Sequence, residues 1–89
     1  MLRKGDIIYI GEGFHRRTYL LLSKNKVLDF KKIRKDVLWN VARMNFSKGI
    51  VIEENMFESR LDKGEKETHP PKKKALKALI QRTMFTQEL

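Results

Sequence analysis

Residues 30–44, FKKIRKDVLWNVARM, hold the only tryptophan of the chain within a run of mixed apolar and basic residues. Whether this run is a helix or a strand decides the fold of the chain. When the run is plotted at about 100° per residue, its apolar residues predict an amphipathic helix. Its apolar stripe consists of Ile33, Val37, Val41 and Met44, with Phe30 beside it. Trp39 falls on the opposite side, near Lys32, Lys35 and Arg43. The pattern therefore predicts a helix that presents its tryptophan among cations.

The position of Trp39 allows two interpretations. On a helix surface the indole is a flat platform for a nucleobase, and such stacking contributes about 1–3 kcal/mol per base. Lys35 and Arg43, four residues before and after Trp39, would then hold the phosphates. In the other interpretation the ring is part of the core. Either strands cover that side of the helix, or residues 37–42 form a strand with Trp39 on its inner face.

Positive charge is the strongest global feature of the chain, which has 89 residues, 20 Lys and Arg, 11 Asp and Glu, and a net charge of +9. The excess is concentrated in residues 31–50, with six basic residues and one acidic residue, and in residues 72–89, with five and one. Residues 51–71 are acidic in balance, with three basic and six acidic residues. Concentrated positive charge repels itself unless a polyanion neutralises it, so we expect nucleic acid or an acidic protein surface as the partner.

Several classes of protein are excluded by composition. The absence of cysteine rules out disulfides, thiolate chemistry and cysteine-based zinc sites. The two histidines, His15 and His69, lie in unrelated contexts, so we expect no metal site and no cofactor. No apolar run approaches the roughly 20 residues of a membrane helix, and residues 1–6, MLRKGD, lack signal-peptide features. We therefore expect a cytoplasmic protein without membrane contact.

The spacing of apolar residues predicts an α+β fold: a small, mostly antiparallel sheet, one helix packed on it, and a basic C-terminal helix. The expected strands are residues 6–10, 18–23, 27–30 and 49–54. Residues 24–26, KNK, are interpreted as a tight hairpin turn between the second and third strands. Residues 55–61 fit either one helical turn or an edge strand.

The C-terminal third is expected to consist of a linker and a helix. A compact domain spans residues 1–61, a polar linker that ends in two prolines spans 62–71, and a basic amphipathic helix spans 72–89. The apolar stripe of this helix contains Leu76, Leu79, Ile80, Thr83 and Met84, with Ala75 beside it. The stripe has two candidate partners, the chain's own sheet or the same helix of a second copy, so a homodimer is open.

Two further groups of basic residues are candidates for phosphate contact. In FHRRT, residues 14–18, Phe14 and His15 are suited to stacking on bases, and Arg16 and Arg17 are suited to binding phosphate. The C-terminal helix contributes Lys72, Lys73, Lys74 and Lys77. Lysines in a first helical turn oppose the macrodipole, which favours a role in anion binding. The alternatives are an ordinary basic loop and solvated lysines.

RKGDIIYI at residues 3–10, followed by RRTYLLLS at 16–23, resembles the opening of small SH3-like barrels, including ribosome-associated KOW proteins and MazF-type endoribonuclease toxins. The residues that match the first strand are Arg3, Gly5 and Asp6. Arg17 stands at the toxins' loop arginine, but Thr18 replaces the proline that follows it there, and no second catalytic residue is matched. The resemblance covers about a quarter of the chain. It implies a barrel-like sheet.

These features predict a non-catalytic nucleic-acid-binding protein that prefers RNA to DNA, because mixed aromatic and basic residues suit splayed single strands. The predicted contact residues are Arg16, Arg17, Lys32, Lys35, Trp39, Arg43, Lys72, Lys73, Lys74 and Lys77. The residues show no nucleophile–base pair, phosphate-binding glycine loop or convergent carboxylates. One alternative is a small regulatory or inhibitory protein, of the host-takeover or antitoxin kind, that binds an acidic protein surface. The other is a MazF-like endoribonuclease.

Overall fold

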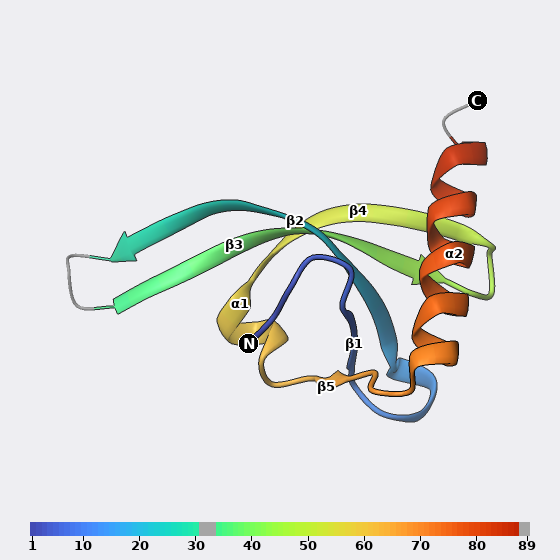
Figure 1. Cartoon of the computed structure of the whole chain (residues 1–89), viewed down its shortest axis with the longest axis horizontal. Coiled ribbons are helices and arrows are strands. Elements are labelled where there is room, and N and C mark those ends of the chain that lie inside the picture. The colour runs from blue at the N-terminus through green and yellow to red at the C-terminus, as the bar shows by residue number, and fades with distance from the viewer. Residues whose placement is uncertain (31–33, 88–89) are drawn as a thin grey trace.

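The fold is a five-stranded antiparallel sheet with one long helix, seen in a computed structural model that describes residues 1–30 and 34–87 (Figure 1). The strands are β1 (Ile7–Ile10), β2 (Arg17–Phe30), β3 (Arg34–Asn45), β4 (Ile50–Phe57) and β5 (Glu65–Lys66). The helices are the 3-10 turn η1 (Gly13–His15), α1 (Glu58–Leu61) and α2 (Pro70–Gln87). The strand order is β4-β3-β2-β1-β5. The prediction of an α+β fold with a C-terminal helix is confirmed.

The helix predicted at residues 30–44 is wrong, because the described part of this segment belongs to strands, and most of it is β3. Val37, Trp39 and Val41 alternate along the strand with other residues, and this period of two places them against one cluster on one face of the sheet. A helical wheel measures only local spacing, whereas β2 supplies an extended partner along the whole of β3. The interpretation of residues 37–42 as a strand is confirmed.

The tight turn predicted at residues 24–26 is also wrong. Strand β2 runs through this segment to Phe30, and its register with β3 shifts after Leu21 and again after Lys24. Irregularities of this kind bend a strand and increase its twist without ending it. Residues 27–30 therefore continue β2 and do not form a separate strand.

Strands β2 and β3 extend beyond the rest of the sheet as a two-stranded ribbon (Figure 1). Residues 26–30 pair with residues 34–38, whereas β4 joins β3 only from Leu38 onward. Lys35 lies on this ribbon and is exposed. The ribbon and α2 lie at opposite ends of the molecule, so Lys35 is remote from the lysines of the helix (Figure 1).

The sheet carries a hydrophobic cluster on each face. The first cluster contains Leu2, Ile8, Tyr19, Leu21, Trp39, Val41, Met56 and Leu61, the last of which comes from α1. The second contains Ile7, Tyr9, Leu20, Ala42, Met44, Val51 and Ile80, the last of which comes from α2. Neighbours such as Ile7 and Ile8 belong to different clusters, as the pleat requires. The central strands are therefore buried on both faces.

Helix α2 packs on the sheet through one side. Ile80 is fully buried, and Leu76 and Met84 are partly buried against the same cluster, as the predicted stripe requires. Near the end of the helix, the Gln87 side-chain amide donates to the Val51 carbonyl at 2.8 Å and accepts the Val51 N–H. Because β4 is an edge strand, these bonds satisfy backbone groups that another chain could otherwise pair with. The apolar stripe of α2 thus packs against the chain's own sheet, and the formation of a homodimer stays a prediction.

The linker predicted at residues 62–71 contains regular structure. Strand β5 pairs with β1, and α2 begins at Pro70. Gly64 allows β5 to approach, because a Cβ atom at this position would lie 2.6 Å from the carbonyl oxygen of Tyr9. The polar segment thus lies at a sheet edge, and its role as a linker between a domain and a helix stays a prediction.

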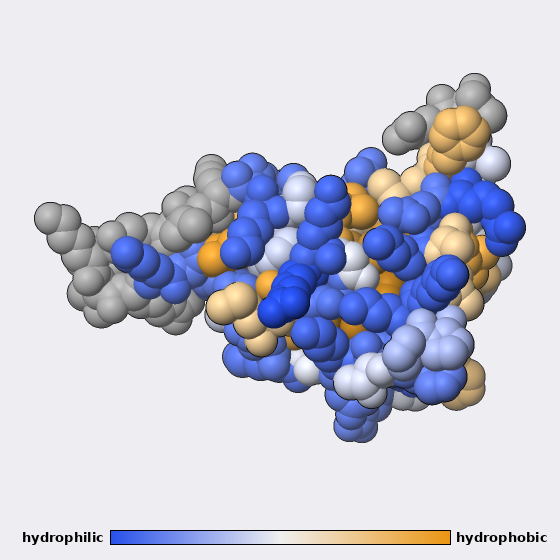
Figure 2. All heavy atoms as spheres, viewed as in Figure 1, coloured by the Kyte–Doolittle hydropathy of each residue, from blue (hydrophilic) through white to orange (hydrophobic). Residues whose placement is uncertain are grey.

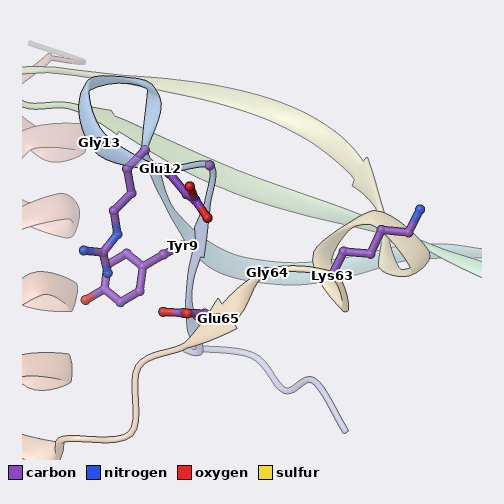
Figure 3. Close-up of a pocket in the computed structure, with 8 residues that line it drawn as sticks. Tyr9, Glu12, Gly13, Lys63, Gly64 and Glu65 are labelled. Carbon is purple, nitrogen blue, oxygen red and sulfur yellow. The ribbon is translucent and has the colours of Figure 1, made fainter.

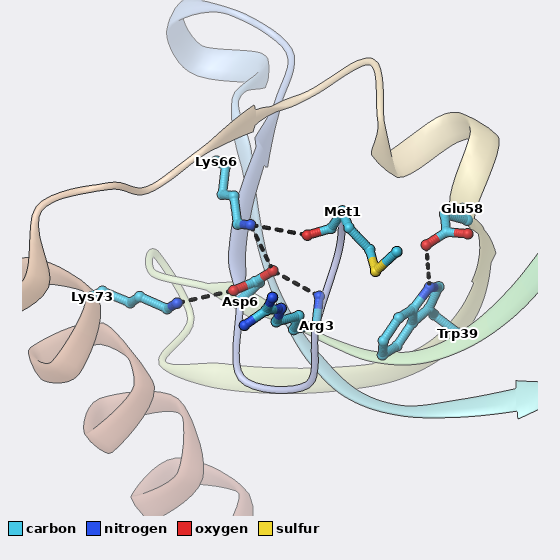
Figure 4. Close-up of polar contacts among 7 residues, drawn as sticks. All are labelled: Met1, Arg3, Asp6, Trp39, Glu58, Lys66 and Lys73. Carbon is cyan, nitrogen blue, oxygen red and sulfur yellow. Dashed lines mark hydrogen bonds and ion pairs between the residues drawn. The ribbon is translucent and has the colours of Figure 1, made fainter.

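Asp6 is a buried carboxylate that joins three parts of the fold (Figure 4). It accepts the backbone N–H of Arg3 at 2.8 Å, and its oxygens lie 2.9 Å from Lys73 Nζ on α2 and 3.1 Å from Lys66 Nζ on β5. Burial by itself raises the pKa of Asp6, but the hydrogen bonds from Lys73, Arg3 and Lys66 outweigh burial and hold the pKa below its usual value. Asp6 therefore holds β5 and α2 against the start of β1.

Strands β4 and β5 form the two edges of the sheet, which is open in the part of the chain that the structure describes. The SH3-like resemblance accordingly stays a prediction. Within the described residues, no helix has both the length and the apolar character needed to cross a membrane.

Replacing Asp6 with Asn should lower the free energy of unfolding by about 1.5–3 kcal/mol, the usual contribution of a hydrogen bond to a charged group. Because the folded-state pKa lies below 3.8, this contribution is present above pH 3.8 and is lost as the pH falls below it. Urea unfolding followed by Trp39 fluorescence measures the change. Asp62→Asn, at an exposed carboxylate, is the control. Equal losses in the two variants would show that the Asp6 contacts do not stabilise the fold.

Candidate nucleic-acid interface

Trp39 is 1% exposed, so the expectation of a surface stacking platform is wrong. Its indole lies in the cluster beneath α1, where Nε1–H donates to Glu58 Oε1 at 3.4 Å (Figure 4). A cation does approach the ring, but it is Lys24, the cross-strand partner, with Nζ at 5.7 Å from the ring centroid. Trp39 is therefore surrounded by residues of neighbouring strands, and not by Lys35 and Arg43, its expected neighbours in a helix.

Aromatic and basic side chains gather instead where the β1–β2 loop meets the β3–β4 turn. These two segments line a hollow of about 340 Å³, here called the arginine hollow. Its lining residues are Phe14, His15, Arg16, Arg17, Arg43, Met44, Asn45, Phe46 and Ser47. The lining contains three arginines and no carboxylate. The fold therefore brings together Arg16, Arg17 and Arg43, three of the predicted contact residues.

The backbone of the β1–β2 loop turns Phe14 into solvent. The loop contains η1, which is closed by a hydrogen bond from Arg16 N–H to the Gly13 carbonyl at 3.2 Å. Gly11 has a φ of +94°, and a Cβ atom there would lie 2.6 Å from the carbonyl oxygen of His15. Only glycine fits this conformation without strain. In the resulting turn, Phe14 is fully exposed.

The β3–β4 turn presents a second ring. The Asn45 side-chain oxygen accepts the Lys48 N–H at 3.1 Å and the Ser47 hydroxyl at 2.8 Å, a local pattern typical of asparagine in turns. Phe46, within this turn, is 55% exposed. Phe46 was not among the contact residues predicted from the sequence. The signal was present, because an aromatic residue inside the turn-forming stretch NFSKG has no place on a strand face.

The arginines of the hollow differ in how they are held. Arg17 is exposed at the start of β2. Arg43 Nε lies 3.2 Å from Glu54 Oε1, and both side chains are partly exposed. The guanidinium of Arg16 lies 3.9 Å from the centroid of the Tyr9 ring. The hollow thus combines one exposed guanidinium with no ion pair among the described residues, one in a solvent-accessible ion pair and one stacked on an aromatic ring.

The predicted contact residues outside the hollow are spread over the molecule, from Lys72, beside the Tyr9 ring that Arg16 also contacts, to Lys35 on the distant ribbon. On α2, Lys72 pairs with Glu67 at 3.4 Å and Lys73 with Asp6 at 2.9 Å. Lys74 and Lys77 are exposed on the helix, and Lys35 is exposed on the distant ribbon. Lys32 lies outside the described residues. Intramolecular carboxylates therefore engage part of the surplus charge, and the arginine hollow is the place where it is gathered with aromatic rings.

Tyr9 connects the β1–β2 loop to α2. Its ring contacts Arg16, and Lys72 Nζ lies 5.8 Å from the ring centroid. Its hydroxyl donates to Glu67 Oε1 at 2.6 Å. Burial, with this hydrogen bond, raises the pKa of Tyr9 to about 12. The hydrogen bond from Tyr9, with the backbone N–H of His69, lowers the pKa of Glu67 to about 2. The Tyr9 ring, against which Arg16 lies, is thus held in place by the hydrogen bond of its hydroxyl group to Glu67.

Comparisons with protein-family models, with curated proteins and with solved structures found no match to this chain. Across residues 1–30 and 34–87, no three His, Asp or Glu side chains lie close enough together to hold a metal ion. The candidate function therefore rests on the geometry and charge of the chain itself.

Trp39 should fluoresce as a buried indole, with emission blue-shifted from that of the urea-unfolded chain and with weak quenching by acrylamide. Bound oligonucleotide should leave the acrylamide quenching unchanged, because the ring has almost no exposed surface on which a base can stack. Strong quenching of the folded protein, or protection of Trp39 by an oligonucleotide, would restore it as a surface platform.

The Tyr9→Phe variant should show a weaker pH dependence of stability than the wild type. Glu67 has a folded pKa of about 2, below its usual 4.5, so its contribution is present above pH 4.5 and is lost toward pH 2. Tyr9 has a folded pKa of about 12, above its usual 10, so its contribution is present below pH 10 and is lost toward pH 12. Urea unfolding across both ranges measures this. Tyr19→Phe is the control, and parallel curves for wild type and Tyr9→Phe would contradict the linkage.

Proposed function

We propose that the protein binds single-stranded RNA at the arginine hollow, without cleaving it. The observation that supports this best is the presence of two exposed aromatic rings and three arginines in one lining that contains no carboxylate. Burial of a phenylalanine side chain in the fold would contribute about 1.5–3 kcal/mol. Because Phe14 and Phe46 are exposed, the fold lacks this stabilisation. A ligand that stacks on the two rings would bury them and gain it on binding.

The hollow matches the two chemical parts of a single strand. Phenylalanine rings stack on unpaired bases, with little preference among sequences. Guanidinium groups bind phosphate through two parallel N–H donors, and Arg17 is exposed at the start of β2. Stacking requires bases that are not already paired within a duplex, so Phe14 and Phe46 favour a single strand over a double helix.

The ion pair of Arg43 does not oppose this role. Both Arg43 and Glu54 are partly exposed. Pairs of this kind contribute only about 0–1 kcal/mol. A phosphate group can therefore replace the Glu54 carboxylate at Arg43 at little cost. Lys74 and Lys77, exposed on α2, add to the positive potential that attracts a polyanion.

An acidic protein partner would use the same cations, but it would need apolar side chains in addition to its carboxylates to cover the aromatic rings, whereas one nucleotide carries both a base and a phosphate. Carboxylates would bind Arg17 and Arg43, but carboxylate side chains have no planar ring to stack on Phe14 and Phe46. The pairing of rings with arginines is therefore the reason to favour RNA.

Phe14→Leu and Phe46→Leu should each weaken binding of a short labelled single-stranded RNA about fivefold or more, because leucine keeps an apolar group but removes the stacking ring. Fluorescence anisotropy measures the affinity. Phe85→Leu, at a 67% exposed ring on α2, is the matched control and should bind as the wild type does. Arg17→Gln should weaken binding and reduce its salt dependence, with the exposed Arg82→Gln as the control.

Three phosphate contacts predict a slope of about −2 for log affinity against log salt on a single strand. The absence of binding at low salt, or equal loss in Phe14→Leu and Phe85→Leu, would contradict the proposal. Electrophoresis of the same RNA after incubation tests the endoribonuclease alternative, because cleavage that disappears in Arg17→Ala would replace binding by catalysis.

A further inference from the structure

A second hollow, of about 430 Å³, adjoins the arginine hollow at Arg16, which lines both. Its lining residues are Tyr9, Gly11, Glu12, Gly13, Arg16, Lys63, Gly64 and Glu65. It is here called the glutamate hollow, because it contains two carboxylates where the arginine hollow has none. Figure 3 shows Glu12 on the β1–β2 loop and Glu65 on β5, on two sides of the Tyr9 ring, whereas the Lys63 side chain extends away from it.

Arg16 offers the glutamate hollow a flat surface for stacking. One side of its guanidinium group lies against the Tyr9 ring at 3.9 Å, and Arg16 as a whole is exposed. Tyr9 is itself anchored by its hydrogen bond to Glu67. The plane of the guanidinium group is therefore set before a ligand arrives. Unpaired bases stack on arginine planes as they do on aromatic rings.

The carboxylates of this hollow are unexpected beside a surface that binds a polyanion. Glu12 and Glu65 are exposed, and within the described residues neither forms an ion pair. Both repel phosphate, so they weaken RNA binding unless they accept hydrogen bonds from a base. A cationic ligand fits less well, because the Arg16 guanidinium belongs to the same lining. A neutral, planar hydrogen-bond donor is compatible with both the arginine and the glutamates.

Among the four RNA bases, guanine alone has two adjacent N–H donors, N1–H and the N2 amino group, on its Watson–Crick edge. A carboxylate accepts both with its two oxygens. Adenine, cytosine and uracil each present a single donor group on that edge. We propose that the glutamate hollow binds a guanine that is stacked on Arg16, with Glu12 and Glu65 as its acceptors. The inference rests on the proposed RNA binding and adds a base preference to it.

Three glycines, Gly11, Gly13 and Gly64, belong to the lining of the hollow and add no side chain to it. A Cβ atom on Gly13 would meet no other atom within 4 Å, so the space beside the loop is free. Gly64 lies so close to the Tyr9 carbonyl that no side chain fits there. The glycines therefore do not narrow the hollow of about 430 Å³ with side chains of their own.

The test compares uridine-rich pentamers that differ only in the central base, by fluorescence anisotropy. Wild-type protein should bind UUGUU at least about fivefold more tightly than UUAUU, UUCUU or UUUUU, the lower limit for a good bidentate base contact. Inosine at the centre, which lacks the N2 amino group, should bind with intermediate affinity. In the Glu12→Gln, Glu65→Gln double variant the preference should vanish, while UUUUU binds no more weakly than it does to the wild type.

Glu53→Gln, at an exposed carboxylate on β4, is the matched control and should keep the preference. Trp39 fluorescence checks that each variant is folded. Equal wild-type affinity for all pentamers would overturn the guanine assignment while leaving RNA binding intact. A preference that survives in the double variant would overturn the roles of Glu12 and Glu65. Failure of every pentamer to bind would overturn the proposed function together with this inference.

Discussion

The arrangement of the fold depends on one buried carboxylate, that of Asp6. Removal of a carboxylate from water costs several kcal/mol unless donors surround it in the folded state. Arg3, Lys66 and Lys73 supply those donors from the N-terminal turn, from β5 and from α2. Because β5 and α2 are far from Asp6 in the sequence, the ion pairs of Asp6 with Lys66 and Lys73 can form only when both elements are in place. The requirement to satisfy one charge thus specifies where the polar C-terminal third of the chain lies.

The same constraint divides the positive charge of the chain into two classes. Lys66 on β5 and Lys72 and Lys73 on α2 are engaged by Asp6 and Glu67, so they stabilise the position of α2 and are less available to a ligand. Arg43 of the arginine hollow is engaged in a partly exposed ion pair, and Arg16 by an aromatic ring. The net charge of +9 alone does not distinguish these classes. Only the second class lies beside exposed aromatic rings, which is why the proposed interface is the arginine hollow.

The candidate site was partly predictable from the sequence. Residues 14–16 of FHRRT lie in the loop between β1 and β2, as the glycines before them and the apolar run after them indicate, whereas Arg17 and Thr18 belong to β2. Trp39 was misplaced because the helical wheel compared it with residues four positions away, whereas in the sheet its neighbours are Lys24 and Met56. Phe46 was missed because residues 30–44 were predicted to be a helix, so NFSKG was not identified as the turn of a hairpin. Its proximity to the FHRRT loop arises from the pairing of β2 with β3, and cross-strand pairing leaves no trace in local spacing.

The sequence by itself determined the α+β class, the positions of most strand segments, the C-terminal helix and its apolar stripe, because each depends on local periodicity and on turn residues. The tertiary structure decided that residues 34–45 are a strand, because a long antiparallel partner in β2 outweighs helical spacing. It also decided which cations are paired and which are free, since ion pairs form between residues more than 50 positions apart, such as Asp6 and Lys73. Contacts of that range depend on the path of the whole chain, which no local pattern encodes.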